Sequence, residues 1–145
     1  MNDAIKLRLR RSALLTALAA SAWLASPQLR ASSQRDEYRF FEAAERMRQL
    51  ALASGDQPYG AVLVLDGAIV GEGPSRVVQR GDANAHAERE AIRDAQKRLG
   101  RDSMAGSILY STSRPCPQCE KAAAEAGVAR MIHGAALVDA GSPRR

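Results

Sequence analysis

The stretch "YGAVLVLDGAIVGEG", Tyr59 to Gly73, carries the strongest structural signal in this chain of 145 residues. Ala61 to Leu65 is a continuous apolar run, as expected of a strand that is buried on both faces. Asp66-Gly67 is a strong hairpin-turn signal, and a return strand begins at Ala68. The stretch therefore predicts a β-hairpin that belongs to a covered sheet.

The segments on either side of this hairpin predict the helices and strands that complete the domain. Helices are expected over residues 36–54, 84–99 and 117–127, and strands over residues 107–112 and 129–138. Asn84 is a candidate cap for the second helix, Gly100 closes it, and Pro117 suits the first turn of the third. The order of helix, hairpin, helix, strand, helix and strand predicts a three-layer α/β/α fold.

The positive charge of the chain is concentrated in its first 31 residues. The whole chain has a formal net charge of +5, but residues 32–145 hold 16 cationic and 15 acidic side chains. A body so close to neutrality lacks the basic surface that favours a phosphate backbone. We therefore expect no nucleic-acid partner.

The same N-terminal residues have the pattern of an export signal. A basic stretch precedes 18 uncharged residues, Ser12 to Leu29, which are rich in Ala and Leu, and the pair Arg10-Arg11 is twin-arginine-like. Two alternatives to an export signal remain: these residues could form an uncleaved membrane anchor, or they could be part of the fold. We divide the chain into an export signal, 1–31, and one domain, 32–145. We expect a periplasmic location, reached by the twin-arginine or general secretory route, with a cytoplasmic location as the alternative. Contact with a membrane is expected only through an uncleaved signal.

Two motifs far apart in the chain contain residue types that bind metals. "AHAEREAI", residues 85–92, contains His86 and Glu88, and "PCPQC", residues 115–119, contains Cys116 and Cys119. The C-x-x-C spacing suits one zinc ion, a redox pair or a disulfide. A histidine added to the two cysteines makes three ligands and leaves an open position, which is the catalytic zinc pattern. A nearby carboxylate that does not bind the metal can take a proton from zinc-bound water.

H-x-E followed by P-C-x-x-C is the signature of the zinc-dependent deaminases of bases and nucleosides, the cytidine deaminase-like superfamily. The chain resembles this superfamily over roughly Glu37 to Ala136, including the hairpin and the segments "DANAHAEREAIR" and "LYSTSRPCPQC". The resemblance implies a zinc-dependent hydrolase with a cytidine deaminase-like α/β/α sandwich. It implies that His86, Cys116 and Cys119 hold Zn²⁺, that zinc-bound hydroxide attacks the base, and that Glu88 is the catalytic proton shuttle.

The stretch "PYGA", residues 58–61, resembles the P-F-G-A of guanine and related nucleobase or nucleoside deaminases. It favours a small nucleobase or nucleoside as substrate, with a guanine-like purine first. The expected substrate contacts are Tyr59, Ser75 and the backbone of Ala87. Two other functions remain open: tRNA adenosine deaminase-like activity, and a catalytically weak or inactive zinc-binding module.

The sequence departs from the pattern of the superfamily in three places. Ser75 stands where both branches commonly have asparagine, and Arg114 replaces the glutamate that commonly precedes P-C. The chain ends at "DAGSPRR", soon after the last expected strand, so we expect a C-terminally short version of the fold. The Ala-rich stretch "KAAAEAG", residues 121–127, predicts a modest core and leaves a homodimer open.

Overall fold

The computed structural model describes residues 27–145, with side chains from residue 33 onward. Its elements, in chain order, are α1 (Pro27–Ala53), β1 (Gly60–Leu65), β2 (Ala68–Pro74), α2 (Val77–Arg80), α3 (Ala87–Leu99), β3 (Ile108–Ser111), α4 (Pro117–Ala126), β4 (Arg130–His133) and β5 (Val138–Gly141). The strands form one mixed sheet in the order β2-β1-β3-β4-β5. Strands β3 and β4 are parallel, and the other neighbouring strands are antiparallel.

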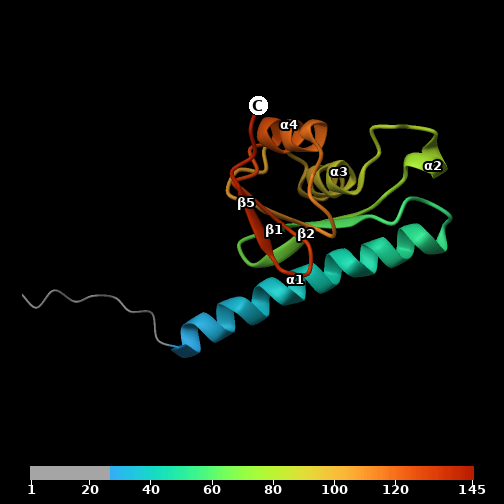
Figure 1. Ribbon diagram of the computed structural model, residues 1–145. Coiled ribbons are helices and arrows are strands. Elements are labelled where there is room, and N and C mark those ends of the chain that lie inside the picture. Colours follow the sequence, from blue (N-terminus) through green and yellow to red (C-terminus); the bar gives the residue numbers. More distant parts are fainter. Residues whose placement is uncertain (1–26) are drawn as a thin grey trace, which may run out of the picture.

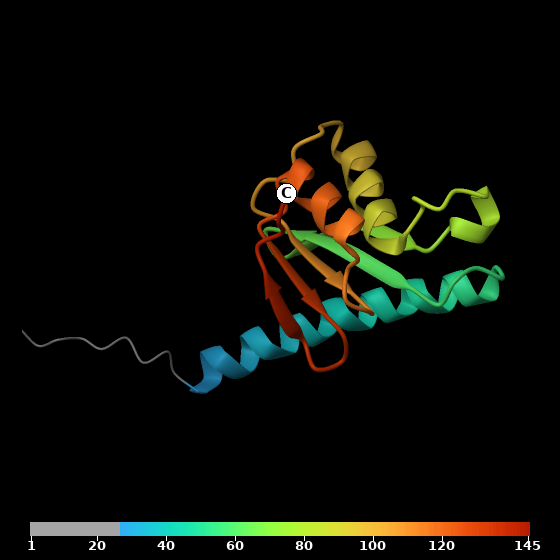
Figure 2. The same ribbon diagram turned by 45° about the horizontal axis from the view of Figure 1, so that its top comes forward.

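Helices cover both faces of this sheet, which confirms the predicted three layers. Helix α1 lies on one face, and α3 and α4 lie side by side on the other (Figures 1 and 2). Successive side chains of the apolar run in β1 point to opposite faces of the sheet, so the run contributes to the core on both faces. Ala61 and Leu63 pack with α3 and α4, whereas Val62 and Val64 pack against the α1 side with Phe40.

The hairpin has the predicted turn and a close contact with α3. Asp66 and Gly67 have φ values of 50° and 76°, which is the left-handed pair that a tight two-residue hairpin requires. Gly73 of β2 lies directly under the first turn of α3, because a Cβ at this position would overlap with Ala87 O and Ala91 N. This glycine therefore fixes the depth at which the start of α3 sits on the sheet.

Helix α1 is longer than the sequence predicted. It begins at Pro27 rather than at Asp36, because proline suits the first position of a helix and neither glycine nor proline interrupts residues 28–53. Its first turns thus overlap the segment assigned to the export signal, whose residues 1–26 lie outside the described part. Among the described helices, none combines the length and apolar character needed to cross a membrane. The division at residue 31 stays a prediction.

The start of α3 also differs from the prediction. His86, not Asn84, is the residue that precedes the helix. Asn84 instead lies in a turn, where its backbone N–H donates to Asp82 Oδ1 at 2.8 Å. The side chain that makes this turn is that of Asp82, since aspartate readily accepts the backbone N–H two residues on. The turn carries Asn84 away from the start of the helix, and the local sequence did not decide between a turn and a cap.

The strand expected over residues 129–138 is shorter in the structure, where β4 covers only Arg130–His133. Gly134 and Leu137 have φ values of 72° and 51°, and they form a turn between β4 and β5. Strand β5, Val138–Gly141, is short and exposed, so it has no apolar alternation that would have revealed it. The last expected strand is therefore followed by a further strand of the same sheet.

Candidate metal centre and its cavity

The three expected zinc ligands come together at the N-termini of two neighbouring helices. His86 precedes α3, and Cys116 precedes α4, with Pro117 at the first helical position. Cys119 follows in the first turn of α4 and donates its backbone N–H to Cys116 Sγ at 3.4 Å. Because α3 and α4 pack side by side on the sheet, two motifs that are 30 residues apart meet at one point.

The spacing of the donor atoms fits a tetrahedral zinc site. His86 Nδ1 lies 3.6 Å from Cys116 Sγ and 3.4 Å from Cys119 Sγ. Zinc bonds of about 2.3 Å to sulfur and about 2.0–2.1 Å to nitrogen give a tetrahedral N···S edge of roughly 3.5 Å. The three donor atoms all lie within 4.8 Å of one another, and both cysteines are free thiols. The residues therefore fit a zinc ion with one open position.

The environment of Cys119 couples zinc binding to proton release. Burial raises the pKa of the Cys119 thiol well above its ordinary value, and the neighbouring Glu88 carboxyl adds to this effect. A bound zinc ion acts in the opposite direction, since a coordinating thiol is deprotonated. Zinc binding at this site is thus expected to displace protons and to strengthen as the pH rises.

The carboxyl group of Glu88 lies beside these ligands but is not one of them. Glu88 is only 5 % exposed. Burial raises the pKa of its carboxyl above the ordinary value, against the opposing influence of its own backbone N–H, Cys119 and His86. A buried carboxyl with a raised pKa holds a proton more readily than an exposed one, which suits a group that takes up and releases protons.

A cavity of about 420 Å³ opens beside the metal ligands. This volume lies within the range of small-molecule sites. The lining residues are Gln57, Tyr59, His86, Ala87, Glu88, Ser113, Arg114 and Cys116. Tyr59 and Ala87, two of the expected substrate contacts, are thus placed beside Glu88. Ala87 opens α3, so its backbone N–H has no acceptor within the helix and can donate to a bound molecule.

Ser75, the third expected substrate contact, does not line this cavity. It is 1 % exposed, and its hydroxyl donates to Asp56 Oδ1 at 2.9 Å. Asp56 also accepts the backbone N–H groups of Gln57 and Gln79, at 2.8 and 2.9 Å. These bonds hold together the loops before β1 and after β2. The geometry gives Ser75 a structural role, and its contact with substrate stays a prediction.

Three cavity residues were not among the sequence-predicted contacts: Gln57, Ser113 and Arg114. Each is close in sequence to a predicted site residue. Gln57 stands two positions before Tyr59, and Ser113 and Arg114 stand just before Cys116. Arg114 had been noted only as a departure from the superfamily pattern. Closeness in sequence to the predicted site residues was therefore the signal that could have indicated these three residues as part of the cavity.

Glu90 ties the loop between β2 and α3 to the start of α3. Its carboxylate is 6 % exposed and receives Arg80 and Arg93 at 2.9 and 2.8 Å, with Arg76 at 3.7 Å. Three arginines around one buried carboxylate leave an excess of positive charge at this point. Arg76 and Arg80 are thus engaged by the protein itself.

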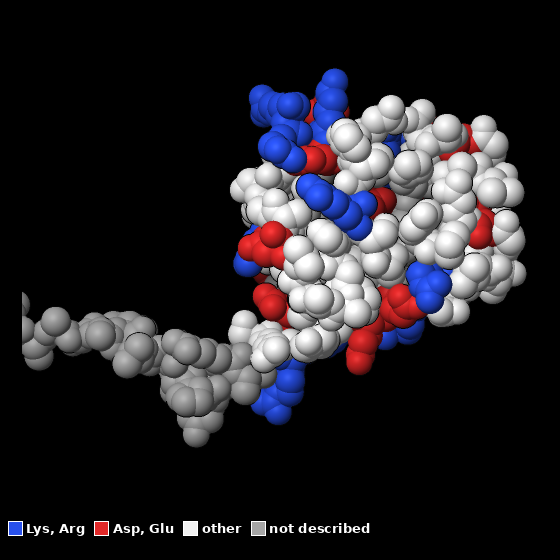
Figure 3. Space-filling view, viewed as in Figure 1, with Lys and Arg blue, Asp and Glu red and all other residues white. Residues whose placement is uncertain are grey.

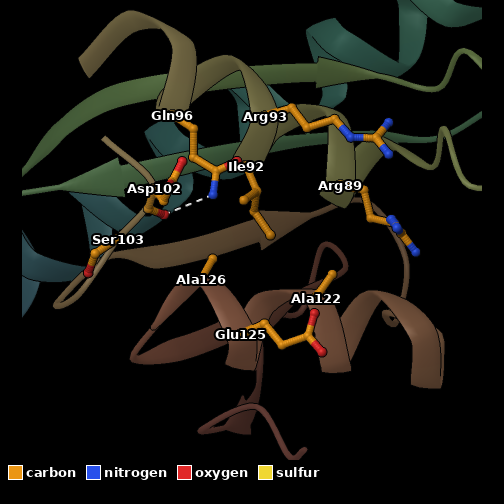
Figure 4. Close-up of a pocket in the computed structure, with 9 residues that line it drawn as sticks. All are labelled: Arg89, Ile92, Arg93, Gln96, Asp102, Ser103, Ala122, Glu125 and Ala126. Atoms are coloured by element: carbon orange, nitrogen blue, oxygen red, sulfur yellow. Dashed lines mark hydrogen bonds between the residues drawn. The ribbon is translucent and has the colours of Figure 1, made fainter. Parts of the chain in front are cut away.

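A second cavity, of about 380 Å³, lies between α3 and α4 (Figure 4). Arg89, Ile92, Arg93 and Gln96 border it from α3, and Ala122, Glu125 and Ala126 border it from α4. Gln96 spans its edge and donates to Asp102 O at 2.8 Å. None of the predicted site residues lines this cavity, so it is separate from the metal centre.

The fold and the site together define a zinc-binding α/β/α domain with a buried carboxyl beside the metal ligands. The chain belongs to the family described as the cytidine and deoxycytidylate deaminase zinc-binding region, whose model matches residues 34–135.

Known proteins of two kinds are similar to this chain. Guanine deaminase of Bacillus subtilis (strain 168) is 50% identical over 62 residues, which are 43% of this chain and 40% of the relative. The tRNA-specific adenosine deaminase of Buchnera aphidicola subsp. Schizaphis graminum is 33% identical over 107 residues, 74% of this chain and 70% of the relative. A solved structure from studies of A-to-I editing by tRNA:A34 deaminases has a TM-score of 0.65 at 36% identity, covering 67% of this chain and 70% of the other.

Proposed function

We propose that the protein is a zinc-dependent hydrolytic deaminase of a small nucleobase or nucleoside, with a guanine-like purine as the favoured substrate. The observation that carries this proposal is the position of Glu88. Its buried carboxyl shares a cavity with His86 and Cys116 and is not part of the metal-binding group. A carboxyl held beside a metal without binding it is suited to acid–base work.

When bound, zinc supplies a Lewis acid that makes water a nucleophile near neutral pH. His86, Cys116 and Cys119 would hold the ion. The Glu88 carboxylate would take one proton from the attacking water and pass it to the ring nitrogen. It would then take the proton of the hydroxyl group newly formed on the ring carbon and pass it to the departing ammonia. Two residues of the cavity wall would position the base. The Ala87 N–H orients its exchangeable group, and Tyr59 lies against its ring.

Three observations support a small purine. The 50% identical stretch of the Bacillus subtilis relative belongs to a guanine deaminase. The cavity of about 420 Å³ also has the size of a small-molecule site. Tyr59, which is 42 % exposed, offers an aromatic face against which a base can stack.

The second candidate is tRNA adenosine deaminase-like activity, which the Buchnera aphidicola relative and the tRNA:A34 deaminase structure favour. The charge of the domain argues for the smaller substrate. On the face shown in Figure 3, Lys and Arg side chains are interspersed with Asp and Glu. The 16 cations and 15 acids of residues 32–145 give the domain little net attraction for a polyanion.

A third possibility is a catalytically weak or inactive zinc-binding module, which Ser75 and Arg114 motivate. Assays for ammonia release separate these functions. The zinc-loaded protein is incubated with purine and pyrimidine bases, their nucleosides, and a tRNA anticodon stem-loop. We expect ammonia release from a free purine or nucleoside, and we expect Glu88→Ala to lose that release while it retains zinc. Release from the stem-loop alone would favour the second candidate, and release from none would favour the third.

We also propose that residues 1–31 direct export, on the strength of the Arg10-Arg11 pair and the apolar run that follows. A reporter fused after residue 31 should be found outside the cytoplasm. Arg10→Lys/Arg11→Lys should keep it inside if the twin-arginine route is used. A cytoplasmic reporter in both forms would contradict export.

A further inference from the structure

The two cysteines of the metal centre differ in their access to small molecules. Cys116 lines the cavity of about 420 Å³ beside Glu88, whereas Cys119 does not. Cys119 is fully buried, and Cys116 is only partly buried. A small molecule that enters the cavity therefore meets Cys116 before Cys119. Access is one of the factors that decide which thiol reacts first with a soluble disulfide.

The two thiols also lie close to each other. Cys116 precedes α4 and Cys119 stands in its first turn, so the pair spans the start of the helix. The Cys119 backbone N–H donates to Cys116 Sγ at 3.4 Å, and the two sulfur atoms lie within 4.8 Å of each other. Residues three positions apart on a helix are spatial neighbours, and C-x-x-C pairs at a helix start form disulfides in redox proteins.

A disulfide between these cysteines and a bound zinc ion exclude each other. Zinc binds cysteine as thiolate at about 2.3 Å, which places two sulfur ligands of a tetrahedral site roughly 3.8 Å apart. A disulfide brings its sulfurs to about 2.05 Å and leaves neither of them as a thiolate. Of the three ligands of this site, His86 alone would remain. Oxidation of the pair would therefore empty the metal site.

We propose that Cys116 and Cys119 form a thiol–disulfide exchange site that controls zinc occupancy, in which Cys116 reacts with small disulfides and Cys119 resolves the product. The Cys116 thiolate attacks a disulfide RS–SR, so the S–S bond breaks, a Cys116–SR bond forms and RS⁻ leaves. The Cys119 thiolate then attacks the Cys116 sulfur, the bond to SR breaks, the Cys116–Cys119 bond forms and a second RS⁻ leaves.

The exchange balances in electrons and protons. The two cysteines lose two electrons, and RS–SR gains them as two thiolates, which take up the two protons that the cysteine thiols release. In the zinc-loaded protein the two sulfurs part from the ion instead of from protons. A dithiol reductant reverses the reaction. This inference concerns the metal ligands and does not depend on which base the protein deaminates.

The test follows sulfur and zinc in the full-length, zinc-loaded protein, without an assay of activity. The probe is hydroxyethyl disulfide, which is small and neutral. A chromogenic chelator reports zinc release, and a sample without the probe gives the spontaneous rate. Mass spectrometry after acid quenching and alkylation shows whether each cysteine is free, joined to half of the probe, or joined to the other cysteine. Protein unfolded in urea shows how fast both thiols react when access is not limiting.

We expect the probe to accelerate zinc release at least about tenfold, in step with the loss of two hydrogens from the protein. Reduction should restore both thiols and zinc binding. Two free thiols and full zinc content, at a time when the unfolded control has reacted completely, would overturn the inference. Zinc release that leaves half of the probe on each cysteine, with no bond between them, would also overturn it.

Serine variants test the order of the two steps. Zinc-free Cys119→Ser should trap half of the probe on Cys116. Zinc-free Cys116→Ser should react at least about tenfold more slowly, because Cys119 is buried. Circular dichroism verifies the fold of each variant, and if one is unfolded the order is read from the first adduct in wild type. A first adduct on Cys119, or equal rates in the two folded variants, would overturn the assignment.

Discussion

His86 Nδ1 lies 3.4 Å from Cys119 Sγ, although the two residues are 33 positions apart in the chain. The contact exists because each residue stands at the start of a helix and the two helices pack side by side on one face of the sheet. The metal centre is therefore a property of the tertiary fold, and zinc binding should stabilise that fold.

Loss of a ligand should remove zinc and destabilise the domain. His86→Ala and Cys119→Ser should each purify with much less than one zinc per chain, and their unfolding free energy should fall by several kcal/mol. His133→Ala is the matched control, since His133 is the other histidine of the chain and is not in the metal-binding group. Metal analysis by mass spectrometry and urea unfolding provide the measurements. Full zinc content in Cys119→Ser would contradict the ligand assignment.

Gly73 should be intolerant of any side chain. In Gly73→Ala the new methyl group would overlap with backbone atoms of Ala87 and Ala91, so α3 must shift on the sheet at a cost of about 2–3 kcal/mol. Gly134→Ala is a control without overlap, because Gly134 has open space around it and only a φ of 72° to maintain; its cost should be about 1 kcal/mol. Urea unfolding compares the two. Zinc affinity should also fall in Gly73→Ala, since His86 and Ala87 move with the helix.

Ser75 should contribute to stability rather than to substrate affinity. Ser75→Ala leaves buried Asp56 without one hydrogen bond and should cost about 1–2 kcal/mol of unfolding free energy. KM should stay within about twofold of the wild-type value, because Ser75 does not line the cavity. Ser113→Ala, at a residue that does line it, should raise KM more and stability should change less. A large rise of KM in Ser75→Ala at unchanged stability would restore Ser75 as a substrate contact.

The stabilisation by Asp56 should depend on pH. Burial alone would raise the pKa of Asp56, but hydrogen bonds from Gln79, Gln57 and Ser75 outweigh it and hold the pKa below the ordinary value of 3.8. A depressed folded-state pKa gives stability that is present above the unfolded pKa and is lost as the pH falls through the folded pKa. Asp56→Asn should therefore be less stable than wild type by about 1–3 kcal/mol at pH 7, and the difference should shrink below a pH of about 4.

The control for this pH dependence is Asp102→Asn, at an exposed position, which should change the unfolding free energy little at any pH. Zinc loss at acid pH affects all three proteins alike, so the comparison uses differences between them. A difference between wild type and Asp56→Asn that stays constant from pH 3 to pH 7 would contradict the hydrogen-bond assignment.

The sequence predicted the centre of the fold well, because local and tertiary signals agree there. The apolar run of β1 favours a buried strand and the Asp66-Gly67 pair favours a tight hairpin turn. The structure contains both. The ends of elements were less predictable. Nothing apolar marks β5, whose residues are exposed, and Asn84 can form either a cap or a turn. Those choices depend on what the rest of the chain packs against.

The metal ligands were predictable because zinc restricts both the residue types and their spacing. The cavity around them was less so, because its lining depends on side-chain directions that no motif specifies. Tyr59 and Ala87 line it as expected, whereas Ser75 turns to Asp56 and Arg114 takes a place at the wall. The residues that would select a substrate thus emerge only when the loops around β1, β2 and β3 are placed in space.

The central claim is that Glu88 moves protons beside a zinc ion held by His86, Cys116 and Cys119. Its most direct test is ammonia release by zinc-loaded wild type and Glu88→Gln, with zinc content measured in both, across a panel of bases, nucleosides and nucleoside monophosphates. The account predicts release by wild type from at least one of these compounds, and a loss of at least about 100-fold in Glu88→Gln at full zinc occupancy. Equal release by the two proteins, or none by the zinc-loaded wild type, would contradict it.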